Sequence, residues 1–444
     1  MSSSKSVKVS RTGHAIRSWT AKPILGSEFT EPPKLQEVYV GFLKQRKDTS
    51  AVIQSISSVL PGFHHLRRCS NGRLLLAPLR SGESSSTSER DGTLSEDELK
   101  NQLKEKGFDL SLLADKFQVT KVPAKPPRTK AQAGEASKVW PVNFHPDATI
   151  ESLIDGSVFD EASLRVIEGI MSLVIEATRL ETVGNLFCTG AAAVVDPEDG
   201  RILAVSAARI DRHPMWHAAM LAVDLVAKLH GGGAWRLDDG KRDEAVKKGA
   251  NHAGGEEDVE KEKETLGEGV SDVEGLRTRL GRIKRRYEED TPLCYPRSLS
   301  TLTFPPQAPL RTRPSRKGRR NSGANAKEEG RGVDAPDTDR SGPYLCTGYW
   351  VFLLSEPCPL CAMALLHSRV SRIFYGAANP RIGVLGSVAV LHTMPGLNHR
   401  YRVWSGILER ECQRAADKVD ARRAPWYLSP RLGCPREGTT MCSE

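Results

Sequence analysis

A chain of 444 residues is long enough for about two domains, and its apolar fraction of 39% is below that of a typical globular protein, so part of it is expected to be solvated. No run of 18 or more apolar residues occurs, which argues against a membrane-spanning helix, and the net charge of +9 favours a polyanionic partner. Nine cysteines, an odd number spread along a chain with no recognisable signal peptide, argue against a disulfide scaffold and favour a reducing compartment with one metal site.

The N-terminal segment, residues 1–34, is expected to be disordered. Its first 27 residues carry five Lys and Arg and neither Asp nor Glu, as transit peptides do, but they lack an apolar helix face. We therefore expect a basic tail rather than an organellar targeting segment.

Residues 35–121 alternate between strand-like and helix-like patterns. The segments 35–43 and 72–79 are typical of strands, and a helix is expected between them. Ser95, followed three residues later by Glu98, is the capping-box pattern that opens a further helix. This alternation predicts a small α+β domain.

Residues 122–159 are Pro-rich and basic over most of their length. Such a composition is typical of an extended linker. We expect this linker to pack onto a domain through Trp140 and Phe144.

The pattern changes in residues 160–234, where a helix, a hairpin and a second helix are expected. Apolar residues recur at helical spacing from 160 to 180. Two apolar runs flank the turn sequence DPEDG at 196–200, which predicts a β-hairpin. The second helix, over 214–230, should end at the three glycines that follow it.

Residues 235–342 interrupt this domain with a segment rich in Gly, Glu, Lys, Arg and Ser. A structureless piece of this length does not fit inside a compact core, so we expect a low-complexity surface insertion that is mostly disordered. Its basic blocks at 282–286 and 311–320 suit non-specific RNA affinity, nuclear localisation or simple solubilising charge.

Strand and helix patterns resume in residues 343–419, and residues 420–444 form a C-terminal tail. Without the insertion the order is α-β-β-α-β-α-β, followed by a strand and a helix. This order predicts an α/β fold, a three-layer α/β/α domain with a mixed sheet, preceded by the small α+β domain.

Two short motifs carry the chemistry of a metal site. WHAAM contains His217 at the start of the second helix, and EPCPLC places Cys358 and Cys361 three residues apart at the start of a later one. Thiolate and imidazole are ligands that zinc prefers, and a helix N-terminus favours thiolate charge. We therefore expect two helix N-termini to meet over one Zn²⁺ ion.

The side chain expected to transfer a proton beside this site is missing. Zinc deaminases carry H-x-E followed by P-C-x-x-C, and the glutamate moves a proton from water to the base. Here Ala219 stands at the position of that glutamate, and its methyl group cannot carry a proton. Glu356, two residues before Cys358, is a candidate substitute, although supporting the local turn is the simpler role for it.

The stretches 213–227 and 345–377 that contain these motifs resemble the noncatalytic subunit of the eukaryotic heterodimeric tRNA adenosine deaminase, in the cytidine deaminase superfamily. The likeness covers roughly 120–230 and 344–415, and it includes the residue other than glutamate at Ala219. The long insertion departs from the family pattern.

The resemblance implies a cytidine-deaminase-like fold and a chain that binds Zn²⁺ through His217, Cys358 and Cys361. It implies a partner subunit that retains the glutamate, and together the two subunits would convert adenosine to inosine at the wobble position of tRNA, in the nucleus or the cytoplasm. It also implies an N-terminal RNA-binding domain. The candidates to contact tRNA there are Lys44, Arg46, Lys47, Arg67, Arg68, Lys121, Lys125, Arg128 and Lys130, and a solvated charged face is the alternative for each single cluster.

Three matters stay open from the sequence. The fourth zinc position is assigned to water by default, with Cys434, Cys442 and the carboxylate of Glu444 as alternatives. The chain could instead be a self-sufficient nucleobase deaminase whose proton shuttle has moved to Glu356. It could also be an RNA-binding scaffold on a degenerate deaminase fold.

Overall fold

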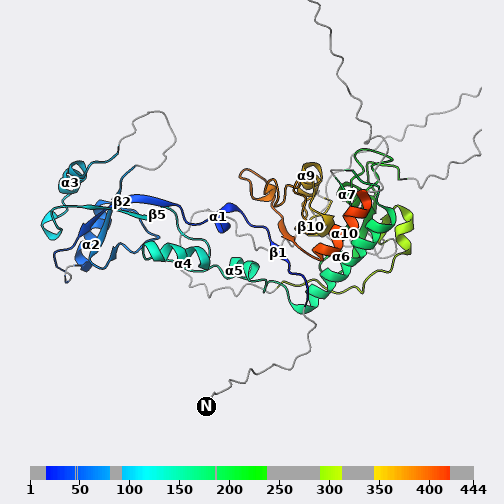
Figure 1. Cartoon of the computed structure of the whole chain (residues 1–444), viewed down its shortest axis with the longest axis horizontal. Helices are drawn as coiled ribbons and strands as arrows, with labels where there is room; N and C mark the ends of the chain where they lie inside the picture. The colour runs from blue at the N-terminus through cyan, green and yellow to red at the C-terminus, as the bar shows by residue number, and fades with distance from the viewer. Residues whose placement is uncertain are drawn as a thin grey trace, which may run out of the picture. The chain divides into compact units, whose positions relative to one another are not determined.

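The computed structural model of the chain describes residues 17–45, 47, 49–80, 93–185, 188–237, 291–312 and 345–420. These residues form two compact units (Figure 1). The N-terminal unit is Leu25–Val158, and the C-terminal unit combines the residues up to Ile24 with those from Phe159 onward. Our expectations for residues 1–16, for most of the insertion and for the tail 421–444 lie outside the described residues.

The C-terminal unit is built on a seven-stranded sheet. Its strands, in order across the sheet, are β1 (Lys22–Pro23), β11 (Arg402–Ser405), β10 (Arg372–Ala377), β9 (Trp350–Ser355), β6 (Ala191–Val195), β7 (Ile202–Ala207) and β8 (Leu293–Tyr295). The strands β9, β10 and β11 run parallel, and β7 and β8 are also parallel. Because β6 is antiparallel to both β7 and β9, the sheet is mixed, as predicted.

Helices cover both faces of this sheet. The helices α6 (Glu161–Glu181) and α10 (Glu409–Asp420) pack together on one face, and α7 (Ala218–Leu229) and α9 (Pro359–His367) pack together on the other. Every residue of β6 and β7 is buried, which explains why both strands are continuous apolar runs rather than alternating ones. The predicted three-layer α/β/α domain is therefore confirmed.

Residues 291–312 differ from the disordered insertion that we expected. They form β8 and a short 3₁₀ helix, and the side chains of Tyr295, Leu299 and Leu310 are at most 5% exposed. The backbone N–H of Leu310 donates to the Pro197 carbonyl at 2.9 Å, so this stretch closes onto the hairpin turn. A few apolar residues are enough to pack this stretch onto the C-terminal unit. The polar residues around them mask this pattern in the sequence.

The residues before Leu25 also correct an expectation, because the predicted disordered N-terminus is folded where it is described. Trp19 is 8% exposed, and the Arg17 guanidinium pairs with the Glu161 carboxylate at 2.8 Å. Strand β1 then adds to β11 at one edge of the sheet. An aromatic residue and the ion pairs of Arg17 with Glu161 and Glu168 thus anchor this otherwise basic segment.

The N-terminal unit contains a second, antiparallel sheet with the order β3 (Cys69–Ser70), β4 (Arg73–Pro78), β2 (Leu35–Phe42) and β5 (Gln118–Pro123). Its helices are α1 (Ser27–Thr30), α2 (Thr49–Val59), α3 (Glu96–Glu105), α4 (Lys130–Val139) and α5 (Ala148–Ile154). The capping box that opens α3 is present, since Ser95 Oγ accepts from Glu98 N and Glu98 Oε2 accepts from Ser95 N. A small α+β unit therefore precedes the three-layer α/β/α unit, as predicted.

The segment 122–159 is more folded than the extended linker that we expected. It completes β5 and forms α4 and α5 within the N-terminal unit. Trp140 is fully buried against Val40 and Leu75 of the sheet, and its Nε1 donates to the Arg67 carbonyl at 2.7 Å. The segment is thus part of this unit's core, because a buried indole with a satisfied N–H ties it to the sheet.

No helix within the described ranges is long and apolar enough to cross a lipid bilayer.

Candidate metal centre

Three predicted ligands converge at the N-termini of two helices in the C-terminal unit. His217 is the N-cap of α7, and Cys358 is the N-cap of α9, where Pro359 occupies the first helical position. Cys361 follows in the first turn of α9, so its sulfur faces the same point as that of Cys358. Neither cap residue makes a side-chain hydrogen bond to its own helix, which leaves the ring and the thiol directed at each other.

The separations between the three side chains fit one tetrahedral cation. His217 Nδ1 lies 3.5 Å from Cys358 Sγ and 3.4 Å from Cys361 Sγ, and all three residues are at most 3% exposed. A zinc ion held at about 2.3 Å from sulfur and about 2.0 Å from nitrogen would separate those ligand atoms by about 3.5 Å. The two separations between nitrogen and sulfur therefore suit such an ion as they stand.

The charge of this cluster also suits a cation. The pKa of the Cys358 thiol is lowered to about 4, because the Cys361 thiol and the His217 ring hydrogen-bond to it. Burial lowers the pKa of His217, but contacts with the charged Cys358 and Cys188 sulfurs raise it overall. Thiolate charge collected in a buried site is the state in which cysteine binds metals.

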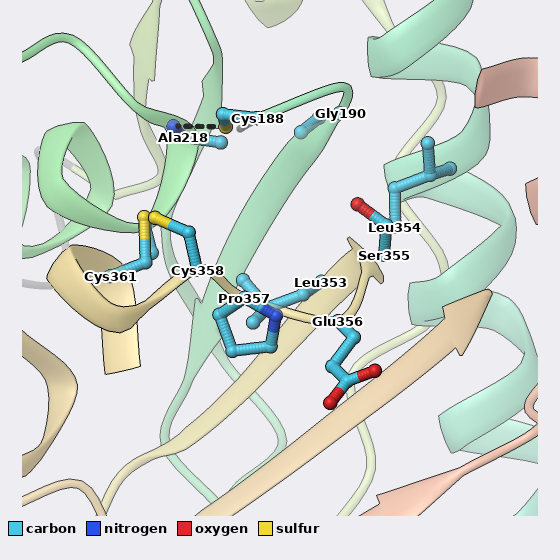
Figure 2. A pocket seen from close by; sticks show the side chains of 12 residues that line it. Cys188, Gly190, Ala218, Leu353, Leu354, Ser355, Glu356, Pro357, Cys358 and Cys361 are labelled. Carbon is cyan, nitrogen blue, oxygen red and sulfur yellow. Dashed lines mark hydrogen bonds between the residues drawn. The ribbon is translucent and has the colours of Figure 1, made fainter. Parts of the chain in front are cut away.

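Ala219 lies in the first turn of α7 and lines a small cavity together with Cys188, Cys358 and Cys361 (Figure 2). The cavity measures about 20 Å³, which is room for about one water molecule. Small-molecule sites are usually several hundred Å³. The pocket beside the triplet therefore has no ionisable group at position 219. It is also too small to hold a nucleobase.

Glu356 does not replace the missing carboxylate. It is 1% exposed, and Figure 2 shows its carboxylate directed away from Cys358 and Cys361. Its Oε1 accepts from the backbone N–H groups of Leu385 at 2.8 Å and Ser387 at 2.9 Å. Its Oε2 accepts from Asn379 N at 3.0 Å and from the Ser387 hydroxyl. Both oxygens are thus engaged in holding the loop that follows β10, which corrects the relocated proton shuttle that we considered.

Cys188 joins this site although no spacing in the sequence connects it to the triplet. It lies just before β6, and its Sγ accepts the backbone N–H of Ala218 at 3.5 Å. Hydrogen bonding with the Cys361 thiol is the largest cause that lowers the pKa of Cys188, to about 6. Only the tertiary arrangement brings it here, so the sequence gives no signal for it beyond the residue type.

The basic residues expected to bind RNA differ in their exposure to solvent. Arg68 is 9% exposed, and its guanidinium donates to the Leu60, Gly62 and Leu76 carbonyls at 2.9, 3.0 and 3.3 Å. It therefore closes the end of α2 from inside the N-terminal unit rather than facing a ligand. Arg46 lies outside the described residues. The exposed candidates are Lys44, Lys47, Arg67, Lys121, Lys125, Arg128 and Lys130.

Replacing Glu356 by Gln is expected to lower the free energy of unfolding of the chain by about 1–3 kcal/mol, because an amide NH₂ would face N–H donors that now find acceptors. Urea denaturation measures this loss. The same change at the exposed Glu409 is the matched control and should alter stability by less than about 0.5 kcal/mol. Equal stability of the two variants would contradict the bracing role of Glu356.

Comparison with known proteins adds to this geometry. No family model matches the chain. It is 28% identical over 411 residues to the "Probable inactive tRNA-specific adenosine deaminase-like protein 3" of Homo sapiens, which covers 89% of this chain and 91% of that protein. It is 48% identical over 83 residues to the "tRNA-specific adenosine deaminase TAD3" of Arabidopsis thaliana, which covers 19% of this chain and 21% of that protein.

A solved structure from "Biochemical and Structural Studies of A-to-I Editing by tRNA:A34 Deaminases at the Wobble Position of Transfer RNA" aligns with 51% of this chain and 83% of its own, at 15% identity and a TM-score of 0.22. The sequence matches to the curated proteins are the stronger relation. By those matches the chain is similar to the tRNA-specific adenosine deaminase-like protein 3 and TAD3 proteins, the subunit type that its motifs resemble.

Proposed function

We propose that this chain is the zinc-binding, noncatalytic subunit of a tRNA adenosine deaminase that converts adenosine to inosine at the wobble position. The observation that carries the proposal is the convergence of His217, Cys358 and Cys361 on one buried point with Ala219 beside it. Such a site holds a metal ion and has no residue at position 219 to move a proton.

Zinc is the ion that this ligand set favours. One imidazole and two thiolates are intermediate to soft donors, which suit Zn²⁺ better than the hard ions Mg²⁺ and Ca²⁺. The ion would supply a fixed positive centre that links α7 to α9 across the buried layer. Its role here is to hold the two helix N-termini together, as in zinc sites that contribute folding energy.

The catalytic glutamate then has to come from a second subunit of similar fold. The names of the relatives in Homo sapiens and Schizosaccharomyces pombe, a probable inactive deaminase-like protein and a deaminase subunit, support this division of labour. The heterodimer would act where tRNA is present, in the nucleus or the cytoplasm.

The N-terminal unit is the part that we assign to tRNA binding. It contains an open groove of about 440 Å³ whose lining includes Phe63, His64 and Arg67. Rings that stack on unpaired bases beside a cation that contacts phosphate are the usual elements of RNA recognition. The exposed side chains of Lys121 and Lys125 add positive charge to the same unit.

The purified chain is expected to contain about one zinc ion, measured by inductively coupled plasma mass spectrometry. Replacing His217 by Ala should weaken zinc binding by at least about tenfold, because one ligand is lost. His64, which is exposed in the N-terminal unit, gives the matched control, and His64→Ala should retain the metal. A wild-type chain without bound metal would refute the zinc assignment.

Alone, the chain is expected to show no deamination of tRNA, and activity should appear when a deaminase subunit with an intact H-x-E motif is added. Inosine at the wobble position is measured by sequencing of the reacted tRNA. The substitution Ala219→Glu should not by itself create activity, because the adjoining cavity of about 20 Å³ has no room for a base. Robust deamination by the unmodified chain alone would overturn the proposal.

Replacing Arg67 by Glu should weaken tRNA binding by the heterodimer for all tRNA sequences alike and lower the salt dependence of log Kd by about 1. The exposed Arg410 of the C-terminal unit offers the same charge change as a control. Filter binding at several salt concentrations measures both effects. If Arg410→Glu weakens binding as much as Arg67→Glu, general charge accounts for RNA affinity and the groove does not.

A further inference from the structure

The triplet of His217, Cys358 and Cys361 supplies three of the four ligands of a tetrahedral site, and Cys188 lines the same small cavity as the two cysteines. Its sulfur accepts the Ala218 N–H at 3.5 Å, and Ala218 is next to His217 along the chain. Figure 2 shows Cys188 at the Ala218 end of the pocket, with its sulfur joined to the Ala218 nitrogen by a hydrogen bond. The same small cavity touches all three cysteines.

The backbone of Cys188 is held in this place from both sides by one residue. Asn185 Oδ1 accepts the Cys188 N–H at 2.9 Å, and the Asn185 N–H donates to the Cys188 carbonyl at 3.0 Å. A Cβ at Gly184 would stand about 2.4 Å from that carbonyl oxygen, so only glycine allows the close approach. The loop therefore fixes the Cys188 backbone and leaves its χ1 torsion to direct the sulfur.

The Cys188 sulfur lies outside the set of ligand atoms within 4.8 Å of one another, so it is a neighbour of the triplet rather than already a member. Rotation about χ1 moves a cysteine sulfur by a few ångströms between staggered positions. A bound cation would draw a thiolate inward, since one imidazole and three thiolates form a common closed zinc shell.

We propose that Cys188 is the fourth protein ligand of the zinc ion, which makes the centre a closed site of one histidine and three cysteines. The proposal rests on the zinc binding proposed above. It assigns to Cys188 the position that water takes in catalytic zinc sites. Closure would keep the chain inactive independently of Ala219, because no water could be activated there even if a glutamate were restored.

The test counts the sulfur ligands directly in the full-length chain. X-ray absorption at the zinc edge should report three sulfur atoms and one nitrogen per ion. The thiolate-to-metal charge-transfer absorption of the Co²⁺-substituted chain should correspond to three thiolates. In Cys188→Ser the sulfur count should fall to two, the Co²⁺ absorption should fall by about one third, and zinc affinity should drop by at least about tenfold. Cys294→Ser, which removes a half-buried thiol on β8, is the matched control and should change none of these.

The outcomes separate this inference from the function on which it rests. Bound zinc with two sulfur ligands in the wild type would overturn the role of Cys188 and leave the zinc assignment standing. Three sulfurs that persist in Cys188→Ser would also overturn it, because another cysteine such as Cys434 or Cys442 would then be the ligand. A wild-type chain that binds neither Zn²⁺ nor Co²⁺ would overturn both proposals.

Discussion

The meeting of two helix N-termini is the constraint on which the rest of the C-terminal unit depends. The helix α7 must begin at His217 and α9 at Cys358, because one residue of slip would turn either side chain from the shared point. The buried hairpin of β6 and β7 positions the first helix, and β9 leads directly into the second. In a zinc deaminase, the glutamate at the position of Ala219 carries the proton. The alanine keeps the geometry of the three candidate ligands but removes that proton carrier.

Glu356 shows how a carboxylate near a candidate metal site can have a structural role. It stands close to the cysteines in the chain, yet its two oxygens are filled by four donors from the loop that follows β10. The same loop contacts the residue before Cys358, since Val384 N donates to the Pro357 carbonyl at 3.2 Å. The Glu356 carboxylate thus helps to hold Cys358 in position and takes no part in proton transfer.

The sequence predicted those features that depend on local pattern. The hairpin around 196–200, the capping box at Ser95 and the two ligand motifs each follow from residues within one turn or one strand of each other. It missed β8, where a few apolar residues stand in polar surroundings, and it misjudged Arg68, whose charge pattern does not reveal that the guanidinium is buried.

Cys188 was missed for a different reason. The approach of its sulfur to the triplet depends on how the segment before β6 lies against the first residue of α7. No pattern in a single sequence encodes such a distance. The residue type alone, one cysteine of nine, was the available signal. Sites that bring together adjacent and distant residues are therefore only partly readable from the sequence.

The two edges of the seven-stranded sheet carry a consequence for assembly. Its outermost strands, β1 and β8, are only two and three residues long, and they come from the start of the described chain and from the insertion. They cover β11 and β7, whose backbone groups would otherwise invite a strand from another molecule. Among the described residues, this sheet offers no long unpaired edge, so a companion protein would gain little by β-augmentation and would have to recognise helices or loops instead.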